Sequence, residues 1–150
     1  MFGSRHRSDV TWYSRISPER RMTLYEKADK AFKEMLDIST DIDKAILYAG
    51  QAVLASNFPD SLNGAMIAKG TQLAGMGDAR ATDMKAAPLT QLVVDAGCAG
   101  MVFFAREPKA DGLAVLATGK KDSRIGLVFY DMKTCMRDAQ EEDEEPEAEA

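Results

Sequence analysis

The sequence predicts an α+β domain in which the elements follow the order helix, two strands, helix, three strands, helix. Two long stretches, near the start and at the end of the chain, repeat apolar residues every three or four positions, as amphipathic helices do. Five short apolar runs are bounded by glycine, proline or charged residues, which is typical of strands. All but one of the links between successive strands are short enough to form hairpins.

Composition and charge divide the chain into three parts. At 150 residues, 45% of them apolar, the sequence predicts one globular domain, over residues 18–140. Residues 1–17 are predicted to form an arm. Residues 141–150 contain seven acids and no base, and they are predicted to form a disordered acidic tail. The tail either binds a partner or inhibits the domain, or it serves only solubility. Without it the net charge changes from −5 to +2, and the near-neutral body argues against a nucleic-acid binder.

The first helix and the first hairpin follow the arm. Ser17 suits the N-cap of a helix, with proline and an acid directly after it. An apolar stripe at helical spacing predicts a buried face formed by Leu24, Ala28, Ala31, Phe32, Met35 and Leu36. Residues 44–57 predict two strands joined at Gly50, which supplies the positive φ of a tight turn. The pair Trp12 and Tyr13 in the arm either folds back on the domain or docks on a partner.

The middle of the chain is rich in glycine and alanine. A second helix is predicted over residues 61–75, with Asp60 or Ser61 as its cap. Glycine is unfavourable in a helix interior, so several of them indicate either close approach of the helix backbone to a neighbour or a flexible or kinked helix. Residues 78–88 follow as a polar loop or a short broken helix.

Three strands and a closing helix complete the domain. The strands are predicted over residues 89–96, 101–106 and 112–118, with glycine-containing turns between the first two. After a polar turn the apolar period changes to that of a helix, with Ser123 as a plausible N-cap. One face of this helix carries Ile125, Val128, Phe129, Met132, Cys135, Met136 and Ala139.

The sequence predicts a protein that is not an enzyme and that carries no cofactor or metal. His6 is the only histidine and lies in the arm, so no histidine-assisted nucleophile can be assembled. Cys98 and Cys135 have neither a disulfide framework nor metal-ligand spacing. No apolar run approaches the roughly 18 residues of a membrane span. We therefore expect a soluble cytoplasmic protein without membrane insertion.

The order of elements closely resembles the roadblock/dynein-light-chain domain, a relative of the longin and profilin-like folds. Residues 43–56 are similar to the first hairpin of that family. Residues 113–119 and 125–128 are similar to the signature of its last strand and closing helix. The resemblance covers about residues 17–140, and the glycine-rich middle, residues 64–88, is longer than in the bacterial pattern.

The resemblance implies a roadblock/longin-like, five-stranded antiparallel sheet with the first and last helices on one face and the middle helix on the other. It also implies a homodimer, in which two middle helices cross closely and the edge strands over residues 89–96 join the two sheets. The candidate interface residues are Leu62, Gly64, Met66, Ile67, Gly70, Leu73, Ala74, Leu92 and Val94.

The resemblance further implies a function in protein–protein interaction and signalling. In the family, the dimer serves as a platform for small Ras-like GTPases, as a regulator or a scaffold. Arg80 is the one candidate for an arginine that reaches a bound GTPase. Two alternatives remain: a scaffold subunit that pairs with other roadblock or longin proteins without affecting nucleotide turnover, and a profilin-like module that senses a small molecule.

Overall fold

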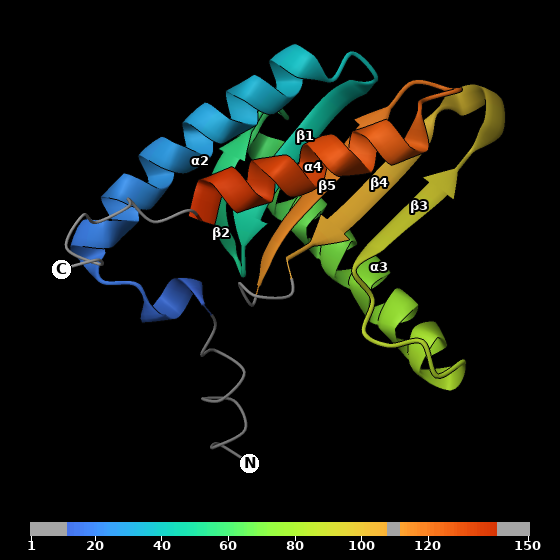
Figure 1. Cartoon of the computed structure of the whole chain (residues 1–150), viewed down its shortest axis with the longest axis horizontal. Helices are drawn as coiled ribbons and strands as arrows, with labels where there is room; N and C mark the ends of the chain where they lie inside the picture. Colours follow the sequence, from blue (N-terminus) through green and yellow to red (C-terminus); the bar gives the residue numbers. More distant parts are fainter. Residues whose placement is uncertain (1–11, 108–111, 141–150) are drawn as a thin grey trace, which may run out of the picture.

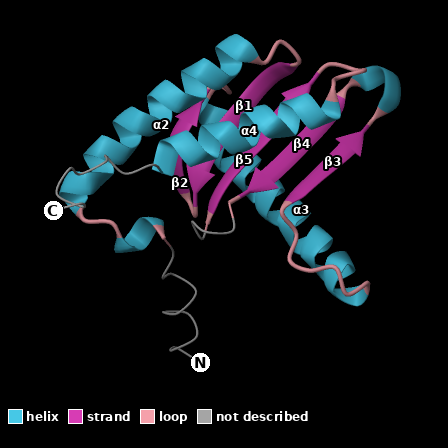
Figure 2. Ribbon diagram, in the orientation of Figure 1, coloured by secondary structure: helices cyan, strands magenta, loops and turns pink. Residues whose placement is uncertain are grey.

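The chain folds into a five-stranded antiparallel sheet with helices on both of its faces (Figure 1 and Figure 2). The computed structural model describes residues 12–107 and 112–140. Its helices are α2 (Pro18–Ile38), α3 (Asn63–Asp83) and α4 (Ile125–Gln140). Its strands are β1 (Ile42–Ala49), β2 (Ala52–Ser56), β3 (Gln91–Asp95), β4 (Met101–Arg106) and β5 (Leu113–Gly119). The predicted fold class and order of elements are confirmed.

The start of the domain forms as its sequence pattern predicts. The hydroxyl of Ser17 accepts a hydrogen bond of 3.3 Å from the backbone N–H of Arg20, which caps α2. All residues of the predicted stripe except Leu36 are fully buried. Trp12 and Tyr13 pack against the same core, so this pair folds back on the domain. The predicted acidic tail and residues 1–11 lie outside the described residues.

The strand order places β5 at the centre of the sheet and β2 and β3 at its two edges. The order is β2-β1-β5-β4-β3, and every neighbouring pair is antiparallel. Gly50 has a φ of +61° in the turn between β1 and β2, as predicted. Because a strand alternates its side chains between two faces, β5 contributes to two separate cores.

The two cores differ in size. Among residues 12–107 and 112–140, 22 buried apolar residues lie between the sheet and the helices α2 and α4, whereas six lie between the sheet and α3. The first core is therefore the main one. On β5, Leu113, Val115 and Ala117 belong to the larger core, and Ala114 and Leu116 belong to the smaller one.

Helix α3 is longer than the sequence pattern predicts. It continues through Asp83, so the prediction of a loop or short broken helix over residues 78–88 is wrong for its first half. The helix ends when Lys85 adopts a φ of +59°. The N–H groups of Lys85 and Ala86 then bond the carbonyls of Thr82 and Ala81, which is the Schellman arrangement. Glycine usually occupies this position, and a lysine there removes the usual sequence signal for a helix end.

Two predicted helix caps are also wrong. A short 3₁₀ turn, Asp60–Leu62, precedes α3, and no side chain caps the helix at Leu62. The hydroxyl of Ser123 donates to the carbonyl of Lys120 within the preceding turn, and α4 begins two residues later. A carboxylate from another part of the chain binds the backbone before α4, as described below.

Candidate functional site

The face of the sheet that α3 covers is less enclosed than the opposite face. The candidate site predicted from the sequence lies on this face. Helix α3 is the only helix of the described residues on this face, and its C-terminal end projects beyond the sheet (Figure 1). The candidate residues fall into three groups: those that face the sheet of their own chain, those that are half-buried, and those that face solvent.

The inward group includes Ile67 and Gly70. Ile67 is 2% exposed and belongs to the smaller core. A Cβ at Gly70 would lie 2.2 Å from the hydroxyl of Tyr48 on β1, so only glycine lets α3 approach this strand. Gly77 has a similar role, because a Cβ there would lie 2.7 Å from Leu89. These contacts correct the prediction that Gly70 faces a second copy of the chain.

Several candidate residues lie between the two extremes. Met66, Leu73, Ala74 and Leu92 are half-buried and pack against the smaller core. They support the orientation of α3 and β3 from within, and only their outer atoms are available to a partner. Their apolar spacing, which the sequence assigned to an interface, serves mainly to bind α3 to its own sheet.

The outward group lies on the solvent side of α3, where small and apolar residues alternate with polar ones such as Lys69 and Gln72. Leu62 and Gly64 are exposed at its start, and Ala68, Gly75 and Met76 continue the exposed side. A Cβ at Gly64 or Gly75 would meet no atom within 4 Å, so these two glycines are not required by packing within the chain. They keep the outer side of the helix slim.

Strand β3 provides the edge of the sheet next to this surface. It pairs with β4 alone, so its other side leaves backbone N–H and C=O groups without a strand partner among the described residues. Val94 is 41% exposed and lies opposite Val102 on the face covered by α3. The predicted position of this strand at an edge is confirmed.

An ion pair joins the end of α3 to the sheet, and no sequence pattern predicts it. A guanidinium nitrogen of Arg106 on β4 lies 2.6 Å from a carboxylate oxygen of Asp78. The same oxygen accepts from the N–H of Leu89 at 3.1 Å, and Arg106 also donates to the Leu89 carbonyl at 2.7 Å. The hydrogen bond from Arg106 holds the pKa of Asp78 below its usual value. This contact sets the path of the chain into β3.

Arg80 lies on the projecting end of α3 rather than in a loop. Its guanidinium is 2.8 Å from the carboxylate of Asp83 one turn later, and the Arg80 side chain is 73% exposed. An exposed ion pair of this kind contributes little to stability. The arginine is therefore accessible to a partner, although Asp83 must release it before it can bind another anion.

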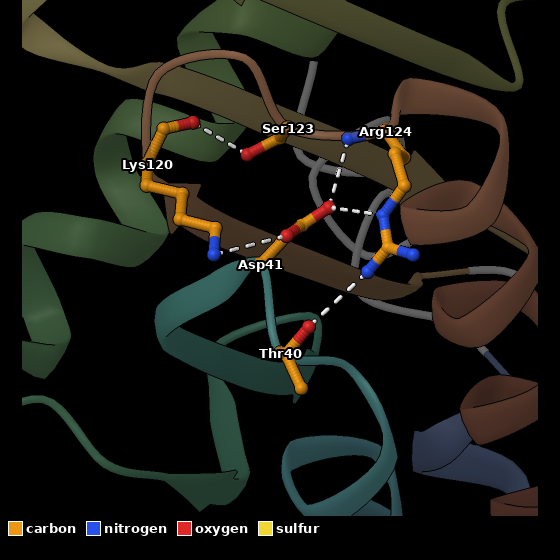
Figure 3. Close-up of polar contacts among 5 residues, drawn as sticks. All are labelled: Thr40, Asp41, Lys120, Ser123 and Arg124. Atoms are coloured by element: carbon orange, nitrogen blue, oxygen red, sulfur yellow. Dashed lines mark hydrogen bonds and ion pairs between the residues drawn. The ribbon is translucent and has the colours of Figure 1, made fainter.

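A second aspartate organises the opposite face and was also missed. Asp41, which is 5% exposed, accepts from the backbone N–H of Arg124 at 2.8 Å and from its side chain at 3.1 Å (Figure 3). Lys120 approaches the other carboxylate oxygen at 3.5 Å, and Arg124 also donates to Thr40. These hydrogen bonds, the backbone one first, lower the pKa of Asp41. The cluster connects the start of β1 to the start of α4.

The described residues contain no cluster of three or more potential metal ligands and no disulfide. Cys98 is exposed in the turn before β4, and Cys135 is buried in the main core, where burial raises the pKa of its thiol to about 12. None of the helices in this part of the chain has the length and apolar character that crossing a membrane requires.

Comparison with solved structures identifies the fold. A roadblock/LC7 domain from Streptomyces avermitilis superposes with a TM-score of 0.63 at 13% identity, covering 73% of this chain and 91% of that one. The gliding protein MglB from Thermus thermophilus superposes with a TM-score of 0.59 at 17% identity, covering 77% and 87%. No family model and no curated protein matches the sequence. The domain thus has the roadblock fold.

Proposed function

We propose that this protein is a non-enzymatic homodimeric platform that binds and regulates a small Ras-like GTPase. The observation that carries the proposal is the open edge at β3, next to the slim outer side of α3, on a sheet with the roadblock fold. The resemblance to roadblock domains suggests both the dimer and the class of partner.

The properties of this edge support the proposed dimer. An edge strand with free backbone groups and an exposed Val94 favours pairing with another strand. A two-fold axis at β3 would extend the sheet across two copies and bring the outer sides of two α3 helices together. Ala68 and Gly75 offer little steric hindrance to that approach.

The mass in solution tests this arrangement. Light scattering of the full chain at micromolar concentration should give twice the chain mass of 16.4 kDa. Ala68→Arg on the outer side of α3 and Val94→Arg on β3 should each shift the mass toward the monomer. Thr23→Arg, at an exposed position of α2, is the matched control and should leave the dimer intact. A monomeric wild-type chain would exclude the platform as proposed.

GTPase regulation is tested with purified small Ras-like GTPases from the same organism. Binding is measured with the GTPase loaded with GDP or with a non-hydrolysable GTP analogue, and hydrolysis is measured in single turnover. A GTPase that binds but hydrolyses GTP at its own rate would indicate that the platform acts on it as a scaffold and not as an activator. Failure of every GTPase to bind in either nucleotide state would contradict the proposed function and would favour the alternative, a scaffold subunit that pairs with other roadblock or longin proteins.

Arg80 distinguishes two ways of stimulating hydrolysis. If its guanidinium reaches the transferred phosphoryl group, Arg80→Ala should reduce the stimulated rate by about 10³-fold or more. If the platform only holds the residues of the GTPase in place, the rate should change little. Lys69→Ala, at an exposed position of the same helix, is the control for loss of a positive charge.

A further inference from the structure

A cavity of about 470 Å³ lies between α3 and one end of the sheet. Its walls come from the ends of β1 and β4, the start of β5, the segment before β3, and the stretch of α3 around Thr71 and Ala74. The volume is within the range of about 300–1,000 Å³ that small-molecule sites occupy. Neither the dimer nor GTPase binding requires this space.

Tyr48 supplies a hydrogen-bonding group in the wall of the cavity. Its side chain is nearly enclosed, with 4% exposed, and its hydroxyl has no hydrogen-bond partner among the described residues. The hydroxyl oxygen is not one of the fully enclosed side-chain atoms without a partner, so a ligand in the cavity can reach it. Burial raises the pKa of Tyr48 to about 12, so the hydroxyl keeps its proton at neutral pH and can donate it. The absence of a side chain at Gly70 provides the room for this hydroxyl next to α3.

The charges around the cavity are balanced. Arg106 is the cation of the wall, and its guanidinium already binds Asp78 and the carbonyl of Leu89. Glu107 is the anion of the wall, and its carboxylate accepts a hydrogen bond from the Gln140 amide at 2.9 Å. A charged ligand would therefore lose hydration without gaining an unpaired counter-ion.

The remaining wall is mixed, because the polar residues Gln51, Thr71 and Thr90 line it together with apolar ones. Phe104 and Ala114, on the face covered by α3, are 2% and 5% exposed and offer little surface to a ligand. A ligand of this site thus needs an acceptor for Tyr48 and no net charge.

We propose that this cavity binds an uncharged small molecule that has one carbonyl-type acceptor for the Tyr48 hydroxyl. The proposal is independent of the GTPase function. Because α3 forms one wall of the cavity and also carries the proposed interface, a bound ligand would contact the inner side of the helix whose outer side meets the partner.

The test uses three probes of similar shape and different charge: N-methylbenzamide, benzoate and protonated benzylamine. Each is titrated into the full ¹⁵N-labelled chain while backbone amide shifts are followed. N-methylbenzamide should give saturable shifts at Thr71, Thr90 and Leu113, and the two charged probes should bind at least about tenfold more weakly. Absence of saturable shifts at these residues, or tighter binding of a charged probe, would overturn the proposal.

Two pairs of variants locate the binding. Tyr48→Phe should weaken the binding of N-methylbenzamide by roughly 2- to 12-fold through loss of one hydrogen bond. Tyr25→Phe on α2 should leave the affinity unchanged. Ala74→Leu should fill the cavity and abolish binding, whereas Ala65→Leu on the exposed side of α3 should not. Unchanged affinity in Tyr48→Phe would refute the assigned hydrogen bond. A folded Ala74→Leu that binds normally would refute the site.

Discussion

The α2/α4 face and the α3 face of the same sheet differ in how completely they are covered. Two helices enclose the first face, where 22 apolar residues are buried, and one slim helix covers the second, where six are buried. Neighbouring residues of β4 show the contrast. Phe103 is fully buried under α4, in edge-to-face contact with Phe129, whereas Phe104 borders the cavity under α3.

On each face an aspartate joins a helix to the sheet. The aspartate on the α2/α4 face is more deeply buried than the aspartate on the α3 face. Asp41 is 5% exposed and binds both the backbone and the side chain of Arg124. The Asp78 side chain is 38% exposed and binds Arg106 near the free end of α3. The comparison indicates that the α2/α4 face provides most of the stability, while the α3 face keeps surface and space available for binding.

Truncation of the two phenylalanines should produce the largest effect and the clearest contrast. Phe103→Ala is expected to lower the free energy of unfolding by roughly 3–5 kcal/mol, because it leaves a void in the main core. Phe104→Ala should cost about 1 kcal/mol less than Phe103→Ala, since the core around Phe104 contains fewer buried side chains and can relax more easily into the space. Urea unfolding followed by circular dichroism measures both, and equal losses would contradict the difference between the faces.

Two glycines of α3 should respond with opposite signs. Gly70→Ala is expected to destabilise the chain by roughly 1–3 kcal/mol, because the added methyl group collides with the Tyr48 hydroxyl. Gly75→Ala meets no atom and should stabilise the helix by up to about 1 kcal/mol. Thermal unfolding measures both changes. Adding Tyr48→Phe to Gly70→Ala should recover part of the lost stability. A failure to do so would show that the loss does not come from the collision with the Tyr48 hydroxyl.

The ion pair of Asp78 should give the smallest effect, and one that depends on pH. Asp78→Asn is expected to cost about 1 kcal/mol at pH 7, reduced by the partial exposure of the pair. The folded pKa of Asp78 is lowered, so its contribution is complete above the unfolded value of about 3.9 and is lost as pH falls through the folded pKa.

The wild-type chain and Asp78→Asn should therefore converge in stability below about pH 4. Denaturant unfolding at neutral and acidic pH measures the difference between the two proteins. Asp83→Asn, in the exposed pair with Arg80, is the control and should change stability by less than about 0.5 kcal/mol at either pH. A constant difference between wild type and Asp78→Asn across this range would show that the carboxylate does not act through its charge.

The sequence by itself determined the elements and their order, because those features depend on nearby residues. The cap at Ser17 and the turn at Gly50 rely on contacts within a few positions, and the apolar period of α2 and α4 shows which sides become buried. The edge place of β3 was implied by the resemblance to roadblock domains.

Only the tertiary structure decided what the polar groups and the glycines do. Asp41 and Arg124 are 83 positions apart, and Asp78 and Arg106 are 28 apart, so no local pattern pairs them. Gly70 and Gly75 belong to the same helix, and the sequence treats them alike. The fold turns Gly70 toward Tyr48 and Gly75 toward solvent, because only the packing of α3 on the sheet defines which side of the helix is inside.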